Sequence, residues 1–183
     1  MTYTIEDLVA RHSRLFLSGR PHDSYLPPGW VGIVDQLCAD IAALLNDSEA
    51  QTFRVTQIKE KFGALRFYFS LDDQQTRMVD IVNRGMRYRL EPENPTPAFL
   101  KISTLVYAAE KASSKTCEEC GMPGRMRVLA GDFSVTAKGY FTLGEDKITQ
   151  PLLNGWLKCL CDHHVDAAAA SAAGRHPPGE DEE

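Results

Sequence analysis

The chain lacks any long hydrophobic run. None of its 183 residues lies in a stretch that approaches the ~20 consecutive apolar residues needed to cross a bilayer. Its first residues also lack a basic segment followed by an apolar one, which is the pattern of a secretory signal. We therefore expect a cytoplasmic protein. In a reducing cytoplasm, its five cysteines are more typical of metal ligands and buried thiols than of disulfides.

The motifs of common catalytic sites are missing as well. The sequence has no glycine-rich phosphate loop, no H-E-x-x-H motif and no H-x-E paired with P-C-x-x-C, the pattern of zinc deaminases. His12 and His22 are possible bases, but no residue marks a partner for either. The sequence thus favours a non-enzymatic protein without catalytic residues. A zinc-dependent hydrolase is the enzymatic alternative, in which water would replace one metal ligand.

The net charge of −5 is unevenly distributed along the chain. Residues 1–50 carry 3 basic and 7 acidic side chains, whereas residues 51–112 carry 10 basic and 7 acidic ones. Residues 113–165 balance at 6 and 6, and residues 166–183 carry 1 basic and 5 acidic side chains. Only the middle of the chain has a charge that suits a nucleic acid or another acidic partner. A solvated face explains the same excess.

The hydrophobic pattern has a helical period first and a strand period later. Thr4–Asp7 resembles a capping box and predicts a helix that ends at Ser18-Gly19. A longer apolar stripe predicts a second helix over residues 30–45, with Cys38 as a packed thiol within it. Alternating apolar residues then predict a β-hairpin over about residues 52–71.

Two more helices are expected after this hairpin. Asp72 or Asp73 is a suitable N-cap for a third helix. Its apolar face would comprise Met78, Val79, Val82 and Met86. A fourth helix is expected from about Ala98 to Ser113. The elements predict an α+β fold, in which residues 1–113 form a domain of helices packed on a β-hairpin.

Two pairs of residues near the C-terminus predict a metal site. Cys117-x2-Cys120 with Gly121 after it is typical of a zinc knuckle, because the glycine permits the tight turn. Cys161-x2-His164 repeats the spacing. The four residues complete a tetrahedron with no open position, which is the pattern of a structural zinc. Reduced cysteines that happen to lie near one another are one alternative. A redox-active C-x-x-C is another, although two glutamates between the thiols oppose the thiolate that it requires.

Two neighbouring residues compete for the second pair. The segment GWLKCL predicts a strand, with Cys159 inside it and Cys161 at its end, where a knuckle would turn. His163 is adjacent to His164 but lacks the two-residue spacing. Cys159 and His163 are therefore second choices as ligands.

Residues 114–165 would form a zinc-ribbon-like module at the C-terminal side of the domain. Strands are expected in GRMRVLA and GWLKCL. Glycines among alternating apolar residues predict an inserted hairpin at about 131–152, and long insertions often carry binding surfaces. Residues 166–183 are expected to form a helical extension followed by a disordered acidic tail.

Three segments carry a resemblance to known proteins: IKEKFGALRFYF, SSKTCEECGMPGRMR and GWLKCLCDHH. Together they resemble small zinc-ribbon-containing proteins of phages, prophages and other bacterial mobile elements, which share a K-E-K-F-G-x-L-R-F-Y hairpin, a C-E-x-C-G-x-P-G-R knuckle and a G-W-x-K-x-L-C-D-x-H ending. The resemblance implies a zinc ribbon on Cys117, Cys120, Cys161 and His164. It also implies the cytoplasm of a bacterium or of a phage-infected host. It implies no activity, because no common function is known for the set, and the insertion and His163 depart from its pattern.

Basic residues in the middle of the chain are candidates for nucleic-acid binding. On the predicted third helix, Arg77, Arg84 and Tyr88 would form one stripe, with Arg87 beside it and Asp80 on the same face. The others flank the hairpin turn and the first knuckle: Lys59, Lys61, Arg66, Arg125 and Arg127. A basic patch with an aromatic residue for base stacking would suit a nucleic acid.

Binding to a protein is the function that the sequence favours. The chain is small and acidic at both ends, and a structural metal reduces the core that it needs. Acidic surfaces fit the basic clefts of nucleic-acid-processing machines. With the mobile-element resemblance, these features predict a factor that binds a host protein or protein complex, for example as an inhibitor of a host defence complex.

Overall fold

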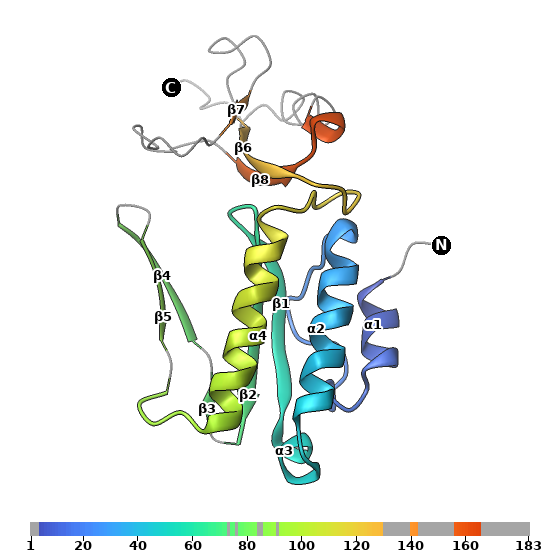
Figure 1. Cartoon of the computed structure of the whole chain (residues 1–183), viewed down its shortest axis with the longest axis vertical. Coiled ribbons are helices and arrows are strands. Elements are labelled where there is room, and N and C mark those ends of the chain that lie inside the picture. The colour runs from blue at the N-terminus through green and yellow to red at the C-terminus, as the bar shows by residue number, and fades with distance from the viewer. Residues whose placement is uncertain are drawn as a thin grey trace, which may run out of the picture.

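The computed structural model describes residues 4–72, 74–75, 77–83, 86–90, 92–129, 140–142 and 156–165. Three helices, α1 (Ile5–Arg11), α2 (Val31–Leu44) and α4 (Pro97–Ser113), lie side by side, and α2 and α4 cover one face of an antiparallel sheet (Figure 1). The sheet has the order β1–β2–β3, formed by β1 (Arg54–Lys61), β2 (Ala64–Leu71) and β3 (Gln74–Gln75). A 3-10 helix, η1 (Pro28–Trp30), precedes α2, and α3 (Asp47–Thr52) precedes β1. This is the predicted α+β fold.

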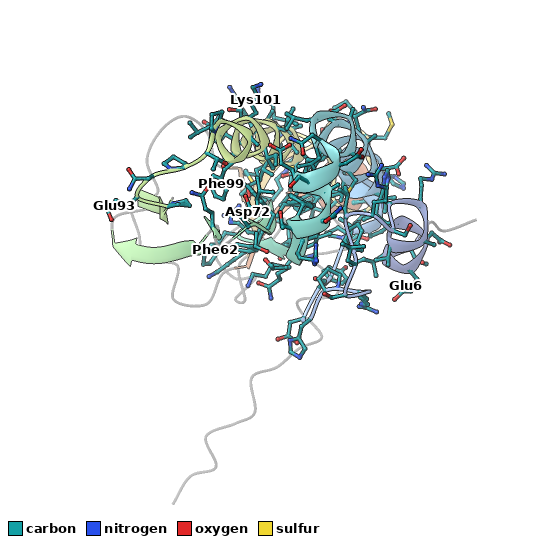
Figure 2. All side chains as sticks on the ribbon, turned by 90° about the horizontal axis from the view of Figure 1, so that it is seen from below. Glu6, Phe62, Asp72, Glu93, Phe99 and Lys101 are labelled. Atoms are coloured by element: carbon teal, nitrogen blue, oxygen red, sulfur yellow. The ribbon has the colours of Figure 1, made fainter. Side chains whose placement is uncertain are left out.

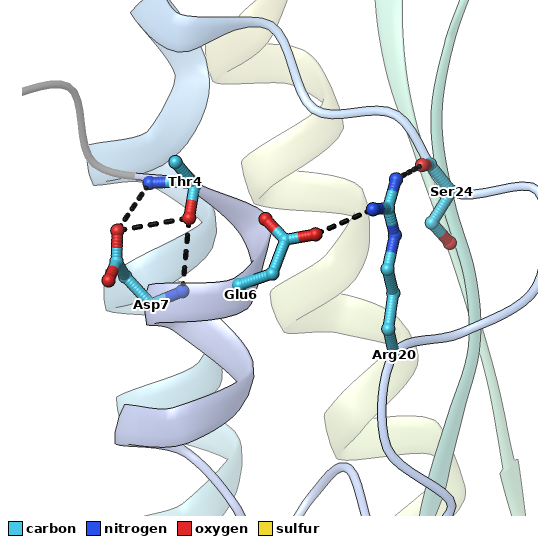
Figure 3. A network of polar contacts seen from close by, with 5 residues as sticks. All are labelled: Thr4, Glu6, Asp7, Arg20 and Ser24. Carbon is cyan, nitrogen blue, oxygen red and sulfur yellow. Dashed lines mark hydrogen bonds and ion pairs between the residues drawn. The ribbon is translucent and has the colours of Figure 1, made fainter.

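Helix α1 begins with the predicted capping box but is shorter than expected. The Asp7 N–H donates to the Thr4 hydroxyl at 3.3 Å, and the Thr4 N–H donates to the Asp7 carboxylate at 2.8 Å (Figure 3). The helix ends at Arg11, and turns follow in place of the predicted continuation to Ser18. Leu15 and Phe16 are nevertheless buried, because the turns point them into the core as a longer helix would.

The predicted β-hairpin is confirmed as β1 and β2. Lys61 pairs with Ala64, so only Phe62 and Gly63 form the turn. Their φ angles of +55° and +68° match a type I′ turn, whose twist suits adjacent strands. On the core face, the Phe69 ring lies 4.9 Å from the Phe99 ring of α4, measured between centroids. Figure 2 shows Phe99 directed towards the sheet and Lys101 directed away from it.

Helix α4 confirms the predicted fourth helix and also covers an edge of β2. Among the described residues, β3 pairs with β2 only at Ser70 and Leu71. Further along the same strand, the Leu65 N–H donates to the Ser113 hydroxyl at 2.9 Å, and the Phe67 N–H donates to the Glu110 carboxylate at 3.4 Å. Side chains of α4 thus satisfy backbone donors of a strand edge.

The predicted third helix is wrong. Its residues form two antiparallel strands, β4 (Arg77–Asn83) and β5 (Met86–Leu90), with Val79 opposite Tyr88. Figure 1 shows this hairpin standing apart from α4. The β-branched residues Val79, Ile81 and Val82 favour an extended chain. Over so short a stretch, the apolar positions fit the helical period of about 3.6 residues and the strand period of 2 equally well. The helical stripe of basic residues is therefore also wrong.

The C-terminal module is a second three-stranded sheet with the order β7–β6–β8. The two predicted strands are present as β6 (Arg125–Leu129) and β8 (Trp156–Leu160), which pair antiparallel. A short strand, β7 (Tyr140–Thr142), lies within the predicted insertion and pairs with β6. The rest of the predicted hairpin at 131–152 and the predicted tail at 166–183 lie outside the described residues. The domain boundary at residue 113 stays a prediction.

Candidate metal centre

The first pair of cysteines lies on a tight turn that follows α4. The Gly121 N–H donates to the Cys117 carbonyl at 2.9 Å, and the Cys117 N–H donates to the Met122 carbonyl at 2.8 Å. Gly121 has φ of +75°, which a residue with a side chain rarely adopts. The backbone thereby turns within five residues and brings Cys120 back beside Cys117.

The second pair lies where β8 ends. Cys161 follows the last residue of the strand, and residues 162–165 form one helical turn. The His164 N–H donates to the Cys161 carbonyl at 3.1 Å, so the turn directs both side chains to the same side. This is the strand-end position that the sequence predicts for Cys161.

The four predicted ligands come together as one cluster. Their ligand atoms, one each from Cys117, Cys120, Cys161 and His164, all lie within 4.8 Å of one another. The Sγ atoms of Cys120 and Cys161 are 3.8 Å apart, too far for a disulfide bond of about 2.05 Å. His164 presents Nδ1, which lies 3.7 Å from the Cys117 Sγ and 3.2 Å from the Cys161 Sγ. The cluster could hold a metal ion.

The second-choice ligands lie outside the cluster. Cys159 is fully buried in the main hydrophobic core, and burial, with the nearby Cys117 and Glu118, raises the pKa of its thiol to about 12. His163 is exposed, and its ring meets the His164 ring edge to face at 5.0 Å between centroids. The thiol of Cys161 differs from that of Cys159. Burial is the largest single effect and raises the pKa of Cys161, but the hydrogen bonds with His164, Cys117 and Cys120 together outweigh it and lower the pKa to about 6.

Two acidic residues beside the cluster, Glu118 and Asp162, form ion pairs that no sequence motif indicated. Glu118, between the cysteines of the first pair, is 2% exposed and contacts the Lys158 ammonium of β8. Burial raises the pKa of Glu118 in spite of this partner. Asp162, between the residues of the second pair, contacts Arg125 at 2.9 Å and also Arg127. Hydrogen bonds and charge from Arg125 hold the pKa of Asp162 below its usual value.

The first turn is also bound to the helical body, through the segment that starts α2. The Gly29 N–H donates to the Glu118 carbonyl at 2.8 Å, and the Trp30 indole N–H donates to the Thr116 carbonyl at 2.8 Å. A Cβ atom on Gly29 would lie only 2.1 Å from the Cys117 carbonyl oxygen, so this close approach requires a glycine. A Pro-Pro-Gly-Trp segment is the only sequence signal of this contact.

Two of the basic residues proposed for nucleic-acid binding are buried. Arg66 and Arg127 are each 1% exposed, which removes them from any surface patch. Lys59 and Lys61 lie over the rings of Tyr68 and Phe62, and Arg125 contacts Asp162. Arg77, Arg87 and Tyr88 belong to β4 and β5, and Arg84 lies outside the described residues.

Comparisons with known proteins find no match. No family model, no curated protein and no solved structure matches this chain. Within the described residues, no helix is both long and apolar enough to cross a membrane. Function must therefore be argued from the cluster and the surfaces around it.

Proposed function

We propose that Cys117, Cys120, Cys161 and His164 hold a structural zinc ion. A tetrahedral zinc with bonds of ~2.3 Å to sulfur and ~2.0–2.1 Å to nitrogen has S···S edges of ~3.8 Å and S···N edges of ~3.5 Å. The S···S distance between Cys120 and Cys161 is 3.8 Å, and the S···N distances from His164 to Cys117 and to Cys161, 3.7 and 3.2 Å, lie on either side of the expected edge. The other pairs of ligand atoms lie within 4.8 Å. Three thiolates and one imidazole are also a donor set that zinc prefers.

A closed ligand set supports a structural metal over a catalytic one. A hydrolytic zinc keeps one position for water, whereas four protein ligands fill the tetrahedron. The rest of the chain holds both pairs of ligands in place. The backbone of the first pair is hydrogen-bonded to the segment before α2, and Cys159 of β8 packs into the main core. This closed cluster is the observation that carries a non-enzymatic function.

We propose further that the protein binds another protein through its acidic N-terminal region. Residues 1–50 carry 3 basic and 7 acidic side chains, and each of the three arginines faces a carboxylate. Arg20 lies 2.5 Å from Glu6 and 2.9 Å from the Ser24 carbonyl (Figure 3), Arg11 lies 2.8 Å from Asp35, and Arg14 lies 3.5 Å from Asp47. The arginines are neutralised within the region, so its acidic excess faces the solvent.

A protein with a basic cleft is the partner that this charge fits. Complementary charge accelerates association and excludes competing partners of the same sign. The resemblance to proteins of phages and mobile elements supports a host protein, such as a component of a defence or nucleic-acid-processing complex. Nucleic acid itself is disfavoured by the acidic region and by the burial of Arg66 and Arg127.

Affinity capture tests this function. The tagged chain is incubated with bacterial lysate that has been treated with nuclease, and the bound proteins are identified. We expect a defined protein complex that dissociates as salt is raised, because the attraction is electrostatic. Asp40→Lys, on the exposed face of α2, should weaken capture, whereas the matched charge reversal Lys101→Glu on α4 should preserve it. Loss of all capture after nuclease treatment would favour nucleic acid as the partner and overturn this proposal.

A further inference from the structure

The three thiols of the cluster differ in their access to solvent. Cys117 is completely buried, whereas Cys161 is half-buried and Cys120 is exposed. Cys120 and Cys161 are also close together, with 3.8 Å between their Sγ atoms. The edge of the cluster formed by Cys120 and Cys161 is therefore the one that a small reagent in solution reaches first.

The remaining cysteines do not compete for such a reagent. Cys38 and Cys159 are each 0% exposed and lie in the main hydrophobic core. Oxidation of thiols follows their exposure and thiolate character, and a second thiol nearby favours a disulfide over further oxidation. Cys120 and Cys161 are the two thiols of the cluster that solvent reaches, and each is the nearby second thiol of the other.

We propose that Cys120 and Cys161 form an oxidation site for peroxide, and that their oxidation releases the zinc ion of the proposed function, on which this inference rests. The Cys120 thiolate attacks one oxygen of hydrogen peroxide, which gives a sulfenic acid and hydroxide. The Cys161 thiolate then attacks the sulfenic sulfur, forms the disulfide and expels a second hydroxide. Two protons from solvent convert both hydroxides to water, so two thiolates are oxidised and one peroxide is reduced.

The disulfide would take over the cross-link that the metal provides. After oxidation only Cys117 and His164 are left as ligands, and two ligands do not hold a structural zinc. The two knuckles stay joined, because Cys120 lies on the first and Cys161 on the second. The new bond closes a loop over the 40 residues between them, and a disulfide of that span restricts the unfolded chain. The oxidised chain therefore stays folded without its metal.

The test uses the intact, zinc-loaded chain. Hydrogen peroxide is added in steps, the zinc released is measured with a chromophoric chelator, and the disulfides are mapped by mass spectrometry of non-reduced peptides. We expect one zinc released for each Cys120–Cys161 disulfide formed, retention of the circular dichroism spectrum, and zinc rebinding after reduction with dithiothreitol. Cys38→Ala is the matched control, and it should release zinc at an unchanged rate.

Other outcomes overturn the inference. A disulfide between Cys117 and Cys120, or sulfinic and sulfonic acids in place of a disulfide, would contradict the assignment of the reactive pair. A zinc-loaded chain that keeps its metal at a large excess of peroxide would overturn this inference alone. A purified chain that contains no zinc before peroxide is added would overturn the proposed function and this inference together.

Discussion

At the scale of single residues, the choice of ligands depends on which side chains the turns direct inward. The spacing of Cys117 with Cys120, and of Cys161 with His164, was sufficient to predict the cluster, because two-residue spacing is a local property of a tight turn. Spacing alone could not exclude Cys159. Its exclusion depends on β8 packing against the main core, which is a contact between segments far apart in the sequence. The burial of Arg66 and Arg127 has the same origin, and both looked like surface residues in the sequence.

Gly29 gives a prediction at this scale. We expect Gly29→Ala to destabilise the protein by about 1–3 kcal/mol, because the new Cβ would overlap the Cys117 carbonyl oxygen and force the knuckle away from α2. Gly32→Ala, one helical turn later, is the matched control. No atom lies within 4 Å of its new Cβ, so it should be neutral or stabilising by up to about 1 kcal/mol. Urea unfolding of both variants makes the comparison, and equal midpoints would contradict the close packing at Gly29.

Ser113 gives a second residue-scale prediction. Its buried hydroxyl accepts the Leu65 N–H of β2 and donates to the Glu110 carbonyl. Ser113→Ala should cost about 1–3 kcal/mol, because it leaves a buried backbone donor without its partner. Ser114→Ala removes a hydroxyl that bonds only locally, to the Lys111 carbonyl, and should cost less than half as much. A thermal melt in which the two variants unfold together would count against the role of α4 at the strand edge.

At the scale of elements, the amphipathic helices and the first hairpin were predictable from the sequence. Segments whose pattern is short or fits two periods, residues 77–90 and α3, were not. Helices α2 and α4 have long apolar stripes, and the β1–β2 hairpin alternates over a full strand on each side of its turn. Residues 77–90 contain β-branched residues at spacings that fit both a helix and a strand, so local sequence could not decide between them. Helix α3 was not predicted, although Asn46 and Glu49 form a capping box at its start.

The attachment of α1 to α2 gives a prediction about pH. Asp35 of α2 accepts from Arg11 at 2.8 Å and lies 2.8 Å from the His12 Nε2. Burial alone would raise the pKa of Asp35, but the hydrogen bond with His12 and the charge of Arg11 outweigh it and lower the pKa. A carboxyl group whose pKa is lower in the folded state stabilises the fold above its unfolded pKa of about 3.9, and the contribution is lost as the pH falls through the lowered value.

We therefore expect Asp35→Asn to destabilise the protein by up to about 1 kcal/mol at pH 7, as a partly exposed ion pair allows. The difference between the variant and the unmodified chain should shrink below about pH 4, where Asp35 becomes protonated in the unfolded chain. Gln36→Glu, at the neighbouring exposed position, controls for the general effect of charge on α2. A difference that stays constant from pH 7 to pH 3 would show that the charge of Asp35 does not hold α1.

At the scale of the whole molecule, the segments that carry the cluster contact the N-terminal part of the chain, which the sequence predicts as a separate domain. The first knuckle is hydrogen-bonded to the start of α2, β8 contributes Cys159 to the core between the helices and the first sheet, and Gly63 at the hairpin turn approaches Met126 of β6. Metal binding in such a site is coupled to folding, because the unfolded chain has no preformed cluster.

We expect a strong chelator to lower the melting temperature of the entire protein in one transition, and not to melt the C-terminal module alone. Two separate transitions would contradict this coupling.

Native mass spectrometry of the purified chain tests the central claim most directly. We predict one zinc ion per chain in the unmodified protein and in Cys159→Ala, since Cys159 lies in the core and outside the cluster. We predict no zinc in Cys117→Ser, together with a loss of folding or solubility that follows from the metal's contribution to stability. A metal-free unmodified chain that melts as a folded protein, or a Cys117→Ser chain that still carries zinc and melts unchanged, would contradict a structural zinc site.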